Sequence, residues 1–137
     1  MKKRILLFTI FLVLLVSGCQ ETVYKESKKV SDNKGNFEFT LNTSIPVYDV
    51  ELQVRYTTLR KGVQTFDGDI ISPSGEKYHD WTHLGSTSSS RGSSLLDSLY
   101  FNNVKSEDGK FSISFEVTGV NKVIIKQATL KIKRGKE

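Results

Sequence analysis

A strict alternation of apolar and polar residues runs through most of the chain and limits what it can fold into. Its clearest example lies between residues 48 and 56, where apolar side chains take every second position: Tyr48, Val50, Leu52, Val54 and Tyr56. Successive side chains of an extended strand point to opposite faces, so these five share one face. A helix would scatter them around its axis. The segment is therefore expected to be a half-buried strand.

Shorter segments repeat this pattern, and turn-forming sequences separate them. Further strands are expected at residues 37–42, 63–71, 77–84, 111–117 and 124–133, with turns at 72–75 and 106–110. Gly68 is expected to form a β-bulge. Residues 95–101 fit helical spacing as well, but a strand is favoured. The serine-rich segment 85–94 is expected to be a loop.

About seven short strands without a convincing helix in the domain predict an all-β fold, an antiparallel β-sandwich. Alternation on one side only is typical of two sheets, each with one solvated face. The sandwich domain is expected to cover residues 37–134, followed by a tail at 135–137.

The N-terminus has the composition of an export signal. Lys2, Lys3 and Arg4 precede an apolar run from Ile5 to Val16 that only Thr9 interrupts. Roughly 12 apolar residues are too few for a transmembrane helix, which needs about 20. A basic region, a short apolar region and small residues before a cleavage point indicate a signal peptide.

Cys19 is the only cysteine of the chain and directly follows Ser17 and Gly18. This is where a bacterial lipoprotein carries its lipid, so we expect a lipoprotein signal peptide at 1–18 and acyl chains on Cys19 that bind the membrane. A plain secretory signal or an uncleaved anchor is the alternative. Gln20 favours the outer membrane of a Gram-negative bacterium. Residues 19–36 are expected to be a polar tether between the lipid and the domain, and its Val23 and Tyr24 can dock onto the domain.

The charge is unevenly distributed. The formal net charge of +5 falls to +2 once Lys2, Lys3 and Arg4 leave with the signal, and this remainder divides into +5 for residues 122–137 and −3 for residues 19–121. An exported, anchored protein is not expected to bind nucleic acid despite its basic character. Lysines on the solvated face of a last strand explain the charge most simply. A basic surface that meets membrane headgroups or an acidic protein is the alternative.

The one polar cluster with catalytic residue types runs from Tyr78 to His83 and includes His79, Asp80 and Trp81. The two histidines are four residues apart, and Asp80 could supply a third ligand. A lone pair of this kind is a weak zinc pattern, so we predict no metal and no other cofactor. Tyr78, His79, Trp81 and His83 are instead the candidate binding residues. A single tryptophan in a small β-domain is usually buried, and exposed stacking is the alternative.

Other catalytic patterns are weak or missing. No Gly-x-Ser-x-Gly elbow and no glycine-rich phosphate loop occurs in the sequence. Asp67 and Asp69 fall on one face of a strand, where a pair of carboxylates suits a divalent cation, although solvated positions explain them better. The sequence therefore predicts no catalytic residues and no enzymatic activity.

Four features together resemble the gliding-motility-associated GldH lipoproteins of Bacteroidota. They are Val16-Ser-Gly-Cys19, the strand Val47–Tyr56, the turn Ser72–Lys77, and the closing strand Ala128–Lys133 after Phe111–Phe115. The resemblance covers most of the mature chain. It implies a small lipidated β-sandwich without enzymatic activity that serves the envelope machinery of gliding and its linked protein secretion.

These observations give three hypotheses, of which the least favoured is an enzyme or metal protein centred on His79, Asp80 and His83. The first is a membrane-anchored, non-enzymatic envelope lipoprotein that binds another protein of such a machinery. The alternative is a surface lipoprotein that binds glycans through Trp81 and Tyr78.

Overall fold

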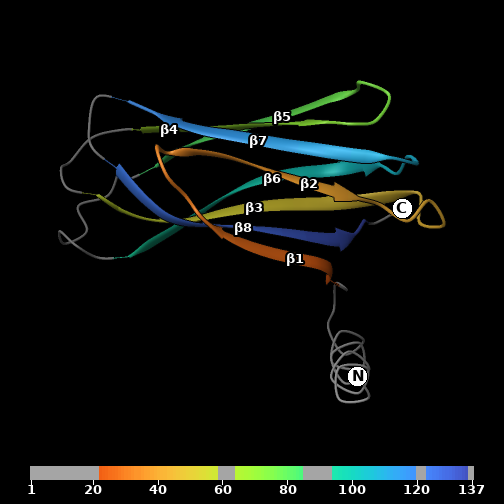
Figure 1. Ribbon diagram of the computed structural model, residues 1–137, viewed down its shortest axis with the longest axis horizontal. Coiled ribbons are helices and arrows are strands. Elements are labelled where there is room, and N and C mark those ends of the chain that lie inside the picture. Colours follow the sequence, from red (N-terminus) through yellow and green to blue (C-terminus); the bar gives the residue numbers. More distant parts are fainter. Residues whose placement is uncertain (1–21, 59–63, 85–93, 120–122, 136–137) are drawn as a thin grey trace, which may run out of the picture.

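Eight strands form two antiparallel sheets that face each other (Figure 1). The computed structural model describes residues 22–58, 64–84, 94–119 and 123–135. In sheet A the spatial order is β1 (Thr22–Lys29), β8 (Val123–Arg134), β3 (Val47–Thr58) and β6 (Leu95–Lys105). In sheet B it is β2 (Lys34–Thr40), β7 (Lys110–Thr118), β4 (Gln64–Ile71) and β5 (Lys77–Leu84). The predicted antiparallel β-sandwich is confirmed.

The core lies between the sheets and contains the residues that alternation had placed on one face. The five inward side chains of β3, from Tyr48 to Tyr56, are each at most 2% exposed. β7 contributes Phe111, Ile113, Phe115 and Val117 from the opposite sheet. Complete burial of such a side chain stabilises the fold by about 1.5–3 kcal/mol. This layer fixes which side chains of each strand reach the solvent.

The structure also decides the elements that the pattern left open. Residues 95–105 form a strand, as favoured, and the turn after β4 is present, with the Gly75 N–H donating to the Ser72 carbonyl oxygen at 2.9 Å. Gly75 has a φ of +95°, a conformation that glycine adopts without a steric penalty. None of the described residues belongs to a helix able to cross a bilayer.

The bulge expected at Gly68 is absent, because β4 pairs with β5 and β7 in continuous register there. Bulges lie in sheet A instead, where β3 meets β6 near Asn103 and where it meets β8 after Arg55. Asn103 has a φ of +59° and donates its N–H to Asp49. The bulge lets both Phe101 and Val104 face the core although they are three residues apart.

The prediction of a polar tether at residues 19–36 is wrong, because most of this segment belongs to the folded domain. β1 pairs along its length with β8, and β2 already begins at Lys34. β1 contains no fully buried residue, so its composition resembles that of a linker. Backbone hydrogen bonds to β8 hold it in place, and these do not depend on apolar side chains.

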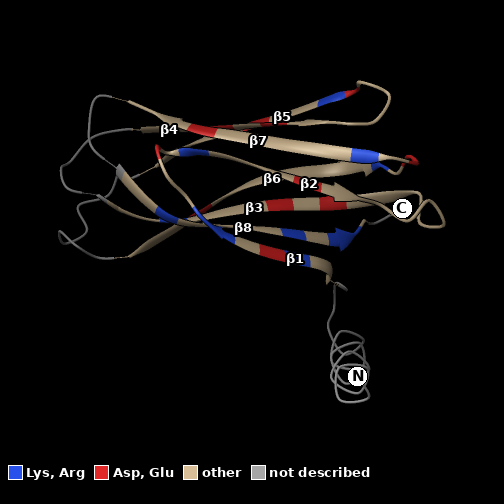
Figure 2. Cartoon of the chain, in the orientation of Figure 1, with Lys and Arg blue, Asp and Glu red and all other residues tan. Residues whose placement is uncertain are grey.

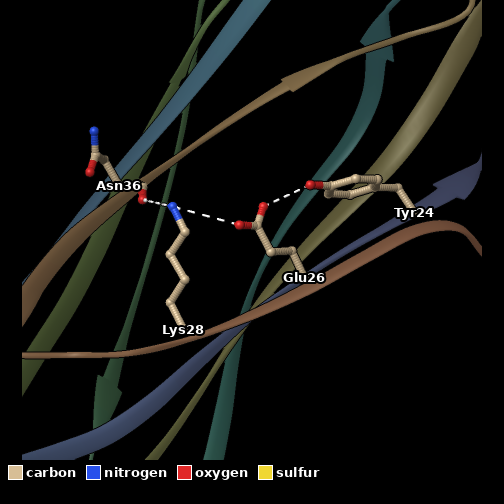
Figure 3. A network of polar contacts seen from close by, with 4 residues as sticks. All are labelled: Tyr24, Glu26, Lys28 and Asn36. Carbon is tan, nitrogen blue, oxygen red and sulfur yellow. Dashed lines mark hydrogen bonds and ion pairs between the residues drawn. The ribbon is translucent and has the colours of Figure 1, made fainter.

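Polar side chains on the inner side of β1 connect the two sheets (Figure 3). The Tyr24 hydroxyl donates to Glu26 at 2.7 Å, and this bond raises the pKa of Tyr24. The Lys28 ammonium nitrogen lies 3.7 Å from a carboxylate oxygen of Glu26, and it donates to the backbone carbonyl oxygen of Asn36 in β2 at 3.2 Å. Its ammonium also lies 4.7 Å from the centre of the Phe37 ring. A charged strand edge thus closes this side of the sandwich.

Some sequence predictions fall outside the described residues. These are the signal peptide, Cys19, the serine-rich segment up to residue 93 and the last two residues of the tail. They stay predictions.

Deleting residues 22–30 should lower the free energy of unfolding by about 2–4 kcal/mol, because β8 loses a strand partner along seven residue pairs. Urea denaturation of the shortened and the mature chain measures the difference. A chain that begins at Thr22 is the control and should match the mature chain. Equal stability of all three would mean that β1 is only a tether.

Candidate functional site

The outer face of sheet B carries most of the residues singled out in the sequence. In β5 the exposed positions alternate, so His79, Trp81 and His83 all point outward. Trp81 is 54% exposed, so the expectation of a buried tryptophan is wrong. Its ring packs edge-on against His83, with centroids 5.1 Å apart. The chain's only tryptophan therefore leaves most of its ring available to a ligand.

Tyr78 and Asp80 lie on the other side of β5 and serve the fold. The Lys105 N–H donates to the Tyr78 hydroxyl oxygen at 3.2 Å, and the Tyr100 N–H donates to Asp80 at 2.9 Å. Burial raises the pKa of Tyr78. Both side chains satisfy backbone groups on the free edge of β6. This corrects the prediction that Tyr78 shares a binding surface with Trp81.

The same geometry argues against the metal site considered from the sequence. Asp80 points away from the face that carries His79 and His83, so the three side chains do not converge. Among the described residues, no group of three or more histidine, cysteine, aspartate or glutamate side chains has a geometry that fits a metal ion.

Strand pairing brings polar residues of four strands into two parallel rows beside the tryptophan. The first row is Trp81, Asp67, Glu116 and Lys34. The second row is His79, Asp69, Ser114 and Asn36. Neighbouring strands lie about 4.8 Å apart, so each row spans about 14 Å across the sheet. The rows form a polar track at right angles to the strands, with the indole at one end.

A surface groove of about 500 Å³ lies along the part of these rows that β2, β7 and β4 contribute. Its lining is made of Lys34, Gly35, Asn36, Asp67, Asp69, Ser114, Phe115 and Glu116. The lining offers carboxylate, amide, hydroxyl and ammonium groups together. Such a mixture binds a ligand that both donates and accepts hydrogen bonds.

Asp69 is held in place by its neighbours on β5. His79 Nδ1 lies 2.6 Å from one carboxylate oxygen of Asp69, and Lys77 Nζ lies 3.8 Å from the other. On its other side, Asp69 is paired in the sheet with Ser114 of β7. In a serine hydrolase the histidine stands between the serine and the acid. Here the acid stands in the middle, so His79 is not placed to activate Ser114.

Only part of this site is recognisable in the amino-acid sequence. His79, Trp81, Asp67 and Asp69 were singled out, whereas Lys34, Asn36, Ser114 and Glu116 were not. The missed residues come from β2 and β7, and only the register brings them beside β4. In the sequence, these residues are marked only as polar positions of segments in which apolar and polar residues alternate.

Comparison with known proteins gives resemblances of fold alone. No protein-family model matches the sequence, and neither does any curated protein. One similar structure is the CBM36-1 domain of a multidomain xylanase from the hindgut metagenome of Trinervitermes trinervoides, with 16% identity and a TM-score of 0.45. The alignment covers 86% of this chain and 91% of that one.

Two further structures are similar at the same level. TmCBM61, solved in complex with beta-1,4-galactotriose, has 16% identity and a TM-score of 0.43, with 84% of this chain and 81% of that one covered. Latent PorU from Porphyromonas gingivalis has 14% identity and a TM-score of 0.43, with 85% of this chain and 11% of that one covered. At these values, none of them assigns a family or a ligand to this protein.

Gly68→Val should lower the free energy of unfolding by about 1–3 kcal/mol, because an added side chain overpacks the core beneath the groove. A Cβ at this position would lie 2.8 Å from Leu99 Cδ1 and 3.2 Å from the Ser114 carbonyl oxygen. Urea denaturation measures the change. Ser112→Val, at an exposed position of neighbouring β7, is the control and should change stability by less than about 0.5 kcal/mol. Equal effects of the two substitutions would contradict this account of Gly68.

Proposed function

We propose that this protein is a non-catalytic, lipid-anchored module that binds carbohydrate on the outer face of sheet B. The observation that carries the proposal is Trp81, 54% exposed beside a polar groove of about 500 Å³. The flat apolar face of an exposed indole suits the C–H face of a sugar ring. The neighbouring polar groups suit the hydroxyls of that sugar.

The two rows supply the hydrogen bonds that a sugar needs. Carboxylates accept from sugar hydroxyls, and Asp67 stands directly across from Trp81 with Glu116 next in the row. Lys34 and Asn36 at the far end donate to sugar oxygens. The contacts of Asp69 with His79 and Lys77 limit its side-chain freedom before a ligand arrives, which lowers the entropic cost of binding. A short oligosaccharide laid across the strands would contact both rows.

Trp81→Ala should weaken oligosaccharide binding by about 30-fold or more, because an exposed aromatic anchor commonly contributes about 2 kcal/mol. A glycan array identifies the ligand, and isothermal titration calorimetry of both proteins measures the affinity.

Tyr100→Ala is the matched control, since Tyr100 is 58% exposed but lies on the outer face of sheet A. It should bind as tightly as the wild type. Unchanged affinity in Trp81→Ala, or equal losses in both variants, would remove Trp81 from the site. An array without any binding would refute the proposal itself.

The anchor is the second part of the proposal. Cleavage before Cys19 and acylation of its sulfur would hold the module on a bilayer, because two or more acyl chains bind durably. Mass spectrometry of protein from its native host should show an N-terminal peptide that begins with acylated Cys19. Cys19→Ser should leave the membrane fraction. A free thiol or a retained leader would contradict the anchor.

A protein of the gliding and secretion machinery is the second candidate partner, as the family resemblance implies. Trp81 favours it too, because exposed tryptophans are frequent hot spots of protein interfaces. A photo-crosslinking residue at position 81 in the native host should then capture one defined envelope protein. The same residue at position 100, on the outer face of sheet A, is the control. Capture of the same proteins from both positions would reject a specific partner.

A further inference from the structure

We infer that the outer face of sheet A rests on an anionic phospholipid surface and turns the Trp81 face away from it. The inference deepens the proposed function, since it rests on the anchor at Cys19. Three independent observations carry it: the charge of this face, the exposed apolar side chains on it, and the place where the chain enters the domain.

The outer faces of the two sheets differ in charge, as the strand register shows for the charged residues that are coloured along the strands in Figure 2. The register places six cations on the outer face of sheet A: Lys25, Lys29, Arg55, Lys105, Lys131 and Lys133. Among the described residues, only Asp49 and Glu51 oppose them on that face. On sheet B, Lys34, Lys77 and Lys110 stand against Glu38, Asp67, Asp69 and Glu116. Sheet A therefore attracts anions, whereas sheet B is close to neutral.

The lysines at the β1 side of sheet A lack ion-pair partners in the part of the chain that the structure describes. Lys25 and Lys131 stand directly opposite each other on neighbouring strands, and like charges in this arrangement repel. No described carboxylate lies within 4.0 Å of either ammonium or of Lys29. Glu51, the nearest acid in the row, pairs with Lys133 at 3.7 Å instead. Anionic headgroups would relieve this repulsion.

The same face carries two of the most exposed apolar side chains in the described residues. Leu96 is 51% and Tyr100 is 58% exposed, and their partners on β3 are Arg55 and Glu51. Both therefore point outward from β6, four residues apart on one strand. A basic surface with exposed tyrosine and leucine matches the chemistry of the headgroup region, where aromatic rings sit beside attracted cations.

The entry point of the chain brings this face close to the bilayer. β1 begins at Thr22 and lies at the edge of sheet A. Thr22 is the third residue after Cys19, so a fully extended chain separates the two by at most about 11 Å. An anchor of this length keeps the lysines of β1 near the headgroups. It leaves the groove on sheet B open to a ligand that approaches from solution.

The orientation is testable because Trp81 is the only tryptophan. Full-length lipidated protein is reconstituted into vesicles of roughly three parts phosphatidylcholine and one part phosphatidylglycerol, with nitroxide-labelled headgroups. Fluorescence of Trp81 should be quenched by dissolved acrylamide but not by the labelled lipid. In Trp81→Phe/Tyr100→Trp the labelled lipid should quench instead. High salt should weaken that quenching because it screens the charges.

A matched pair of charge variants in the Trp81→Phe/Tyr100→Trp background tests the lysines. Lys25→Gln/Lys29→Gln/Lys131→Gln should lower the ratio of docked to undocked domain by at least about tenfold, seen as lost quenching by labelled lipid. Lys34→Gln/Lys77→Gln/Lys110→Gln removes the same charge from sheet B and should change that ratio by less than about twofold. Circular dichroism and urea denaturation check that both variants fold.

The possible failures are distinct. Protein that does not float with the vesicles refutes the anchor, and this inference with it. If the protein floats but labelled lipid quenches tryptophan at neither position 81 nor position 100, the anchor stands and the docked orientation is refuted. The basic face would then be a binding surface for an acidic protein. Lipid quenching of Trp81, or equal effects of the two triple variants, also overturns the inference.

Discussion

The apolar layer between the two sheets is the constraint on which the rest of the structure depends. β3 fills it with five side chains in strict alternation, and β7 and β8 meet them from both sheets. A shift of the register by one residue would turn all of these side chains into water. The core therefore also determines the outer faces. Asp67 and Asp69 point outward because Phe66, Gly68 and Ile70 point inward.

The edges of the sandwich are closed by polar side chains rather than by apolar ones. Lys28 and Glu26 bridge β1 and β2 on one side, and Tyr78 and Asp80 accept backbone hydrogen bonds of β6 on the other. An open strand edge invites pairing with another chain, and charged or hydrogen-bonding side chains discourage it. Both sides of the sandwich are thereby protected against pairing with a strand of another chain.

Those two faces differ, and their difference suggests a division of work. Sheet B presents an indole and a polar groove, whereas sheet A presents lysines, a leucine and a tyrosine. The strand that continues from Cys19 belongs to sheet A. A module that adsorbs through sheet A and binds its ligand through sheet B uses both faces at once.

The sequence by itself determined the strands with an apolar face, the turn at Ser72–Gly75 and the all-β class, because these follow from local periodicity and turn chemistry. Only the tertiary structure decided that β1 is a strand, that Trp81 is exposed and that Tyr78 faces inward from β5. β1 is held by hydrogen bonds to a strand about 100 residues away, and such bonds leave no pattern in its own side chains. The site itself joins four strands through their register, and register is a property of pairs of strands.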